Sequence, residues 1–165
     1  IGYGKTGKSF AKKLSGFNCN IIFCDIKTNL GDNYAREVKI NELKETSDII
    51  SLHTNLNQSS RHIIDKQFID DCKKSFCLIN TARGECVSNH DLIYGLDSGK
   101  IIGAGLDVLE NENKDFEGIA VDQNLDKLKK FDNVILTPHI AGWSKESKVK
   151  LAQITVNKIK EFLDL

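Results

Sequence analysis

The chain has 165 residues, of which 40% are hydrophobic and 28% charged, and its formal net charge is +0. This composition is typical of one soluble globular domain that is large enough to bury a core. A neutral chain lacks the basic surface that nucleic-acid partners require, and its apolar runs are too short to span a membrane. The five cysteines are odd in number and form no Cys-x-x-Cys pair. We therefore interpret them as reduced thiols of a cytoplasmic protein and predict no metal site.

The first seven residues carry the pattern G-x-G-x-x-G, with glycines at Gly2, Gly4 and Gly7. In dinucleotide-binding proteins the first glycine permits a tight turn and the second lets a pyrophosphate approach the backbone. The third lets the following helix pack against its strand. By itself the pattern is equally compatible with an ordinary glycine loop. The motif should follow a strand, of which only Ile1 is present. We therefore expect the chain to be a piece of a longer protein, cut inside its first strand.

The residues after the glycines predict a helix and then a buried strand. Apolar spacing indicates a helix over 8–14, and a short apolar run over 20–25 indicates a parallel strand that ends at Asp25. Asp25 follows Gly7 by 18 residues, close to the roughly 20 expected for the carboxylate that binds the adenosine ribose of a dinucleotide. The alternative role for Asp25 is that of a turn or helix cap at the end of the strand.

The remaining predicted elements alternate along the chain. Apolar runs predict strands over 38–40, 48–53, 75–80, 101–108 and 133–137. Residues that commonly cap helices predict a one-turn helix from Asn41 through Lys44, and further helices after Asp65, after Ser88 (which has capping-box spacing to Asp91) and from Ser144 onward. We expect a loop over 111–132, with a short helix over 125–128.

This alternation predicts an α/β domain with a Rossmann-type, doubly wound parallel sheet. Ile1 would be the remnant of a central strand in a sheet of order 3-2-1-4-5. We assign residues 1–143 to this domain. Residues 144–165 form a C-terminal helix whose apolar residues are spaced for one amphipathic face.

Polar residues of unusual chemistry follow the predicted strands at their carboxyl ends, where ligands bind in open α/β sheets. Arg83 can bind a carboxylate through two parallel N–H donors, and its alternative is an ordinary salt bridge. His139 can transfer a proton and Glu112 can fix its tautomer. Their alternatives are a hydrogen-bonded histidine at a strand end and a solvated loop acid. Asp107 ends another strand at the same edge. Since chance would scatter such residues over both edges, their convergence predicts a ligand site.

Four segments in chain order resemble motifs of the D-isomer-specific 2-hydroxyacid dehydrogenases. This family includes D-lactate, glycerate, formate and 3-phosphoglycerate dehydrogenases. The segments are Ser51-Leu52-His53-Thr54, Asn80-Thr81-Ala82-Arg83-Gly84, Gly105-Leu106-Asp107-Val108-Leu109 through Glu112, and Thr137-Pro138-His139-Ile140-Ala141-Gly142. The resemblance covers nearly the whole chain.

The resemblance implies the NAD-binding domain of an enzyme that transfers a hydride between NAD and C2 of a small D-2-hydroxy or 2-keto acid. It implies that Arg83 binds the substrate, that His139 is the acid/base and that Glu112 tunes His139. Asp107 is expected to orient the nicotinamide amide. The full set expected to contact NAD is Gly2, Gly4, Lys5, Thr6, Gly7, Asp25, His53, Thr54, Asn55, Ser60, Thr81, Ala82, Arg83, Asp107 and His139.

The resemblance also implies that the family's substrate-binding domain, built mainly from a preceding part of the chain, is absent, and that the C-terminal helix returns toward it. Members dimerise through a helix before the glycine motif, so we expect the intact protein to be a homodimer. The 165 residues alone are expected to bind NAD weakly and to catalyse nothing measurable. A second hypothesis is an NAD-sensing corepressor, because relatives with that role keep the arginine, glutamate and histidine.

Overall fold

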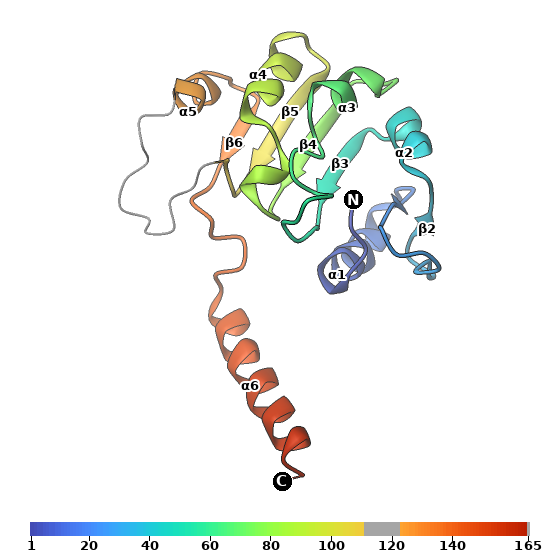
Figure 1. Ribbon diagram of the computed structural model, residues 1–165, viewed down its shortest axis with the longest axis vertical. Coiled ribbons are helices and arrows are strands. Elements are labelled where there is room, and N and C mark those ends of the chain that lie inside the picture. Colours follow the sequence, from blue (N-terminus) through green and yellow to red (C-terminus); the bar gives the residue numbers. More distant parts are fainter. Residues whose placement is uncertain (111–122, 165) are drawn as a thin grey trace.

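A computed structural model describes residues 1–110 and 123–164 (Figure 1). Its strands are β1 (Ile22–Phe23), β2 (Arg36–Glu37), β3 (Ile49–Leu52), β4 (Phe76–Asn80), β5 (Ile101–Leu106) and β6 (Val134–Leu136). Its helices are α1 (Lys5–Leu14), α2 (Ile40–Thr46), α3 (Lys66–Asp71), α4 (Asn89–Asp97), α5 (Gln123–Leu128) and α6 (Lys145–Phe162). Short 3-10 turns cover Ser15–Phe17 and Gly84–Cys86.

The strands form two parallel sheets, β2-β1 and β3-β4-β5-β6, which meet at Ile1. The amino group of Ile1 donates to the Ser51 carbonyl oxygen (2.7 Å), and the Ile1 carbonyl oxygen accepts from the His53 N–H (2.8 Å). On the other side, the Gly2 N–H donates to the Cys24 carbonyl oxygen (2.8 Å). Ile1 therefore holds the place of a central strand between β1 and β3. This arrangement confirms the predicted α/β fold with a Rossmann-type parallel sheet.

The apolar core has two parts. The larger lies between the four-stranded sheet and the helices α3 and α4, which Figure 1 shows in front of the sheet. Its buried members include Ile50, Leu52, Leu78 and Leu106 from the strands and Phe68, Leu92 and Leu96 from the helices. The smaller packs α1 against β1 through Tyr3, Ala11, Phe23 and Ala35. The Tyr3 ring stacks on Phe23 with 3.7 Å between centroids. The glycine turn is thus anchored to β1, and the ends of β3–β6 to the larger core.

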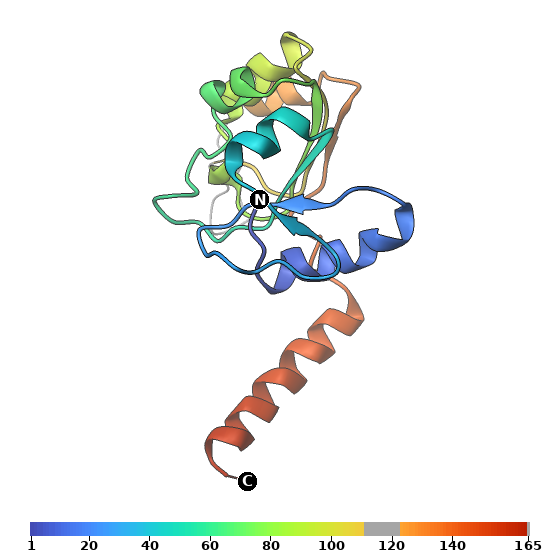
Figure 2. The ribbon, with the colours of Figure 1, turned by 90° about the vertical axis from the view of Figure 1, so that its right-hand side faces the viewer.

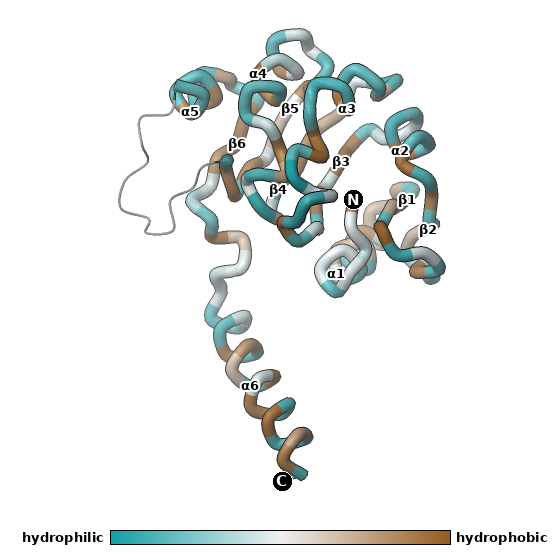
Figure 3. Tube along the Cα trace, in the orientation of Figure 1, coloured by the Kyte–Doolittle hydropathy of each residue, from teal (hydrophilic) through white to brown (hydrophobic). Residues whose placement is uncertain are grey.

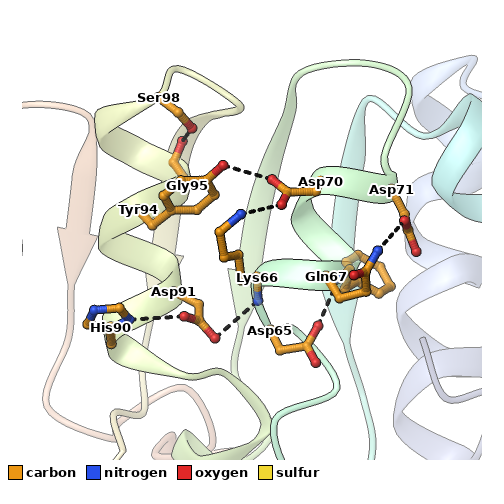
Figure 4. Close-up of polar contacts among 11 residues, drawn as sticks. Asp65, Lys66, Gln67, Asp70, Asp71, His90, Asp91, Tyr94, Gly95 and Ser98 are labelled. Carbon is orange, nitrogen blue, oxygen red and sulfur yellow. Dashed lines mark hydrogen bonds and ion pairs between the residues drawn. The ribbon is translucent and has the colours of Figure 1, made fainter.

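The polar contacts between α3 and α4 hold these two helices together on the outside of the sheet (Figure 4). Asp65 caps α3 by accepting from the Phe68 N–H (2.8 Å), as the sequence predicts. The Asp70 carboxylate pairs with the Lys66 ammonium group and accepts from the Tyr94 hydroxyl (2.9 Å). These contacts lie on the surface and fix how the helix pair covers the core.

The structure corrects two of the predicted boundaries. The strand expected over 38–40 lies at Arg36–Glu37, because the Arg36 N–H donates to Ile21 and the Val38 N–H to Phe23, which sets its register on β1. The predicted cap at Asn41 is also wrong. Helix α2 begins at Ile40, has Lys39 at the N-cap without a side-chain bond, and extends to Thr46. Pairing with β1 decides this register, and the apolar run alone does not reveal it.

Other expected elements occur with small shifts. Ser88 caps α4 by accepting from the Asp91 N–H (3.3 Å), but the reciprocal half of the capping box is absent, because the Ser88 N–H donates to the Ile64 carbonyl oxygen. A complete capping box instead starts α6 at Ser144 and Ser147. The short helix expected over 125–128 is present as α5. The rest of the loop expected over 111–132 lies partly outside the described residues.

Helix α6 runs away from the body of the molecule (Figures 1 and 2). Figure 3 shows hydrophobic residues recurring along this helix. The exposed ones include Val149, Leu151, Ile154, Val156 and Ile159. No α6 side chain is buried against the residues that the structure describes. Within the same described ranges, no helix combines the length and the apolarity that crossing a lipid bilayer requires.

Candidate cofactor and substrate site

The glycine turn needs two of its glycines for its own packing. Gly2 has a φ of +88°, and a Cβ atom there would lie 2.8 Å from the His53 carbonyl carbon. A Cβ atom on Gly7 would lie 2.3 Å from the Gly2 carbonyl oxygen. Gly4 is different, because a Cβ atom there would meet no protein atom within 4 Å. The protein's own packing therefore does not explain why Gly4 is a glycine, whereas close approach of a ligand would.

The N-terminus of α1 opens onto the same place. Gly4 is its N-cap, no side chain caps the helix, and its first turn contains no acidic residue. The first N–H groups of a helix have no partner inside the helix, and the helix dipole favours negative charge there. The N–H groups of Lys5 and Thr6 belong to this turn, so the geometry suits an anionic group such as a pyrophosphate.

A groove of about 1750 Å³ runs from this helix end past the residues that follow β1 to α2. Of the residues predicted to contact the cofactor, it is lined by Gly2, Gly4, Lys5, Thr6, Asp25, His53, Thr54, Asn55 and Ser60. Gly7, Thr81, Ala82, Arg83, Asp107 and His139 do not line it. The structure thus brings together the residues predicted for the pyrophosphate and the ribose. Gly7 packs behind them in α1 against Gly2, and the other predicted residues lie in a second region.

Asp25 follows β1 and bonds to the glycine turn. Its carboxylate accepts from the Tyr3 N–H (2.6 Å) and from the Lys27 N–H (2.9 Å). Burial alone would raise the pKa of Asp25, but the hydrogen bonds from Lys27, Tyr3 and Ile26, together with the Lys27 charge, outweigh burial and lower it. Asp25 is therefore an ionised acceptor at the edge of the groove.

His53 lies behind the glycine turn, with its ring 5.0 Å from that of Phe10. Its Nε2 is 3.1 Å from the Ser51 hydroxyl, while its Nδ1 is buried and has no hydrogen-bond partner. Burial, with a smaller contribution from the nearby amino group of Ile1, lowers the pKa of His53 to about 4. His53 is therefore a neutral side chain at pH 7.

The segment after His53 folds on itself beside the groove. The Ser60 side chain is buried, donates to the Asn55 carbonyl oxygen (2.6 Å) and accepts from the Asn57 N–H (2.9 Å). The Thr54 hydroxyl lies 3.5 Å from the Cys86 sulfur. Ser60 was predicted as a cofactor contact, but its hydroxyl here holds the loop closed.

Arg83 sits on a turn that a buried asparagine shapes. Asn80, which is 0% exposed, accepts from the Ala82 N–H (3.0 Å) and donates to the Arg83 carbonyl oxygen (2.9 Å). The turn also packs tightly, because a Cβ atom on Gly84 would lie 1.8 Å from the Leu109 carbonyl oxygen. Arg83 itself is exposed, and so is Thr81. Sequence reasoning gave Asn80 no role, although a polar residue at the end of an apolar strand was the available signal.

Asp107 holds the segment that carries His139. Its buried carboxylate accepts from the Thr137 hydroxyl (2.6 Å) and from the N–H groups of Ile140 (2.8 Å) and Ala141 (2.9 Å). Burial alone would raise the pKa of Asp107, but these three bonds and the nearby His139 lower it. His139, with a φ of +54°, donates its N–H to the Asp107 carbonyl oxygen (2.9 Å). Thr137 is a second residue that sequence reasoning left without a role.

Backbone bonds bring these elements to one edge of the sheet. The Asp107 N–H donates to the Asn80 carbonyl oxygen (2.9 Å), so the turn with Arg83, the end of β5 and the segment with His139 are neighbours. Glu112 lies outside the described residues. The same edge thus carries a guanidinium group and an imidazole on neighbouring backbone segments, and these are the groups that binding a carboxylate and moving a proton require.

Comparison with known proteins identifies the family of this chain. Residues 1–141 match the family model described as "D-isomer specific 2-hydroxyacid dehydrogenase, NAD binding domain". The chain belongs to this family. A D-specific alpha-keto acid dehydrogenase of Enterococcus faecium is 34% identical over 98% of the chain and 51% of its own length. A D-lactate dehydrogenase of Staphylococcus aureus is 34% identical over 95% of the chain and 49% of its own length. The chain spans about half the length of such relatives.

Solved structures of the family agree with the fold. The NAD complex of a D-isomer specific 2-hydroxyacid dehydrogenase from Lactobacillus delbrueckii ssp. bulgaricus matches with a TM-score of 0.87 and 32% identity, over 97% of this chain and 51% of that one. A D-lactate dehydrogenase from Aquifex aeolicus, complexed with NAD and lactic acid, has a TM-score of 0.82 and 35% identity, over 99% of this chain and 52% of that one. The family resemblance and the NAD cofactor predicted from the sequence are thus confirmed.

The residues present suit NAD as this domain's cofactor. The space beside Gly4 is open, the N-terminus of α1 is free of side-chain caps, and Asp25 presents an ionised acceptor to the groove. These three features match the pyrophosphate and ribose of a dinucleotide. The individual roles of the site residues stay predictions.

Proposed function

We propose that this chain is the NAD-binding half of an enzyme that transfers a hydride between NAD(H) and C2 of a small D-2-hydroxy or 2-keto acid. One observation carries the proposal. Asp107 bonds to the backbone of the segment with His139, and its N–H bonds to the strand end that leads to Arg83. The segments that carry Arg83 and His139 are therefore neighbours at the edge where α/β folds bind ligands, which supports a joint role in binding a carboxylate and transferring a proton.

In this proposal each polar group at the edge has a separate task. Arg83 is exposed and donates two parallel N–H bonds to the substrate carboxylate, which fixes the orientation of C2. His139 donates a proton to the carbonyl oxygen during reduction and removes it during oxidation. Glu112 keeps His139 in the matching tautomer. NAD(H), when bound, supplies or accepts the hydride.

The groove residues position the cofactor. The N–H groups of Lys5 and Thr6 receive the pyrophosphate, and Asp25 accepts from the adenosine ribose hydroxyls. Because the pKa of Asp25 is lowered, its carboxylate is charged at neutral pH and repels a ribose 2′-phosphate. We therefore expect NAD to bind better than NADP. Tighter binding of NADPH than of NADH in a fluorescence titration would contradict this assignment.

The domain limits and the assembly belong to the same proposal. Residues 1–143 form the cofactor domain, and α6, whose apolar side chains are exposed, contacts the substrate-binding part of the intact protein. We also expect a homodimer with a cytoplasmic location, which light scattering and cell fractionation test. No observation on the described residues favours a corepressor, and the relatives above are named as dehydrogenases.

The experiment is to assay the purified full-length protein with NADH and a panel of 2-keto acids that includes pyruvate, glyoxylate and hydroxypyruvate. We expect NADH oxidation with at least one of them, and oxidation of the D but not the L form of the matching hydroxy acid with NAD. Absence of turnover with every acid, in a protein that binds NADH, would contradict the proposed reaction.

A further inference from the structure

A histidine–glutamate pair joins the loop beside the cofactor groove to the segment after β5. The His62 Nε2 atom lies 2.6 Å from Glu110 Oε1, across 48 residues of sequence. His62 follows the 54–60 segment, several of whose residues line the groove. Glu110 follows Asp107 and precedes Glu112 by two residues.

The second oxygen of Glu110 reaches another element. Glu110 Oε2 accepts from the N–H of Asn89 (3.0 Å), the first residue of α4. Helix α4 begins soon after the turn that carries Arg83, and its first N–H groups have no partner within the helix. The side chain of Glu110 is 20% exposed and that of His62 is 41% exposed, so the carboxylate is the better shielded of the two partners. One carboxylate therefore joins three elements. They are the loop over 54–62 beside the groove, called the groove loop below, the start of α4, and the segment after β5.

The backbone around the pair is fixed on both sides. His62 has a φ of +49°, which is uncommon for a residue other than glycine, and its N–H donates to the Glu85 carbonyl oxygen (2.8 Å). On the other side, Gly84 packs against the Leu109 carbonyl oxygen, where a Cβ atom would not fit. Such a backbone conformation persists where surrounding contacts hold it. Backbone contacts therefore hold both His62 and Glu110 in place.

We propose that His62 and Glu110 are positioning residues that hold the groove loop in register with the segments leading to Arg83 and Glu112. The inference rests on the proposed function, because it assumes that the groove binds NAD. The contact between His62 and Glu110 thereby couples the affinity for the cofactor to the turnover of the substrate. Neither residue touches the reacting atoms, so their effect passes through the loop and the segment that they join.

The test uses the full-length protein with His62→Asn and with Glu110→Gln. Asparagine tolerates the left-handed backbone at position 62, but its side chain is too short to keep the contact, while glutamine keeps the size of Glu110 and removes its charge. In each variant we expect the Kd for NADH to rise about fivefold to tenfold and kcat to fall, as for the loss of one charge-assisted hydrogen bond. The double variant should be no worse than the more impaired single variant, because both changes remove the same contact. NADH fluorescence titration, steady-state kinetics and the Tm are measured for each.

The matched control is His90→Asn. His90 also pairs with a carboxylate, at 3.0 Å from Asp91 on α4 (Figure 4), but its side chain is exposed and does not line the groove. The Kd for NADH and the kcat of this variant should equal those of the wild type.

Three results would overturn the proposal. The first is an unchanged Kd for NADH in the folded His62→Asn and Glu110→Gln proteins. The second is a double variant whose change in NADH affinity equals the sum of the two single changes. The third is an equal loss of NADH affinity in the His90→Asn control. A purely structural role would lower the Tm and leave the Kd of the folded protein unchanged. If His62→Asn does not fold, Glu110→Gln decides alone. A wild-type protein that does not bind NADH would contradict the proposed function itself, whereas wild-type binding with unaffected variants overturns only the pair.

Discussion

The cofactor groove and the sheet edge at the carboxyl ends of β4, β5 and β6 are built in different ways. At the groove, backbone geometry sets the shape, because Gly2 and Gly7 occupy places where no side chain fits. At the edge, buried polar side chains set the shape, because Asn80 and Asp107 bond to the turn with Arg83 and to the segment with His139. The comparison teaches that a site can depend on residues that support its shape as much as on residues that react.

Each region combines buried support with exposed groups. At the groove, burial lowers the pKa of His53 to about 4, while Lys5 and Thr6 are exposed. At the edge, Arg83 is exposed and Ile140 is 44% exposed. Changes to the buried residues of either region should therefore act on stability, changes at the exposed pyrophosphate place on cofactor affinity, and changes at the exposed Arg83 on turnover.

The largest expected effect is on the backbone packing of the groove. Gly7→Ala would place a Cβ atom 2.3 Å from the Gly2 carbonyl oxygen, so the free energy of unfolding should fall by about 3 kcal/mol. The control Gly4→Ala meets no protein atom and should lose less than about 1 kcal/mol, yet bind NADH about tenfold more weakly. Urea denaturation and NADH titration measure both. Normal NADH affinity in Gly4→Ala would mean that the pyrophosphate does not lie there.

At the exposed edge, Arg83→Lys should reduce turnover without reducing stability. A lysine replaces the two parallel donors by a point charge, so kcat/KM in the full-length protein should fall about 10²-fold, or about 2.7 kcal/mol. Arg36→Lys is the matched control, since Arg36 pairs with Glu42 on the surface. Near-normal kcat/KM in Arg83→Lys would remove Arg83 from the site.

The buried support of the edge predicts a loss of both stability and turnover. In Asp107→Asn the new amide would face donors that now bond to a carboxylate, so the free energy of unfolding should fall by about 2 kcal/mol. The exposed Asp126 pairs loosely with Lys129, and Asp126→Asn should have little effect.

The same residue predicts a pH dependence. Because the pKa of Asp107 is lower in the folded protein, its stabilisation is present above the unfolded value of about 3.9 and is lost as the pH falls through the folded value. The stability gap between the wild type and Asp107→Asn should therefore narrow below about pH 4. A gap that stays constant down to pH 2.5 would show that the carboxylate charge is not what holds the segment.

The smallest expected effect concerns His53. Its folded pKa of about 4 lies below the unfolded value of about 6.5. Between these values the unfolded chain binds more protons, so stability falls as the pH drops from 6.5 towards 4. Partial exposure limits this loss to about 1 kcal/mol. His53→Gln can keep the bond to Ser51 but has no imidazole to titrate. Urea denaturation at pH 7 and pH 5 should therefore show a smaller fall in the free energy of unfolding for this variant than for the wild type. Identical losses in both proteins would place His53 in solvent.

The sequence revealed the groove better than the edge. The spacing of the glycines and of Asp25 reflects a local backbone turn and one strand, so it can be read from a short window. The boundaries of β2 could not be read in this way. The apolar run over 38–40 was the visible signal, but hydrogen bonds to Ile21 and Phe23 decide the register.

At the edge, the sequence predicted which strand ends carry polar residues, and the resemblance supplied their proposed roles. It did not reveal that Asn80 and Thr137 hold the turns, because their partners are distant in sequence or are backbone groups. It also did not reveal that the Ser60 hydroxyl closes a loop, although Ser60 lines the groove as predicted. Whether a serine faces a ligand or its own loop depends on side-chain direction, which spacing does not encode.

The most direct test of the account is made on the 165-residue chain alone. NADH is titrated into the purified chain, which is then assayed with pyruvate, glyoxylate and hydroxypyruvate. The account predicts NADH binding without steady-state turnover, because the groove lies within the chain while the edge with Arg83 is open to water and does not hold a keto acid in place. Clear turnover by the chain alone, or a folded chain that does not bind NADH, would contradict it.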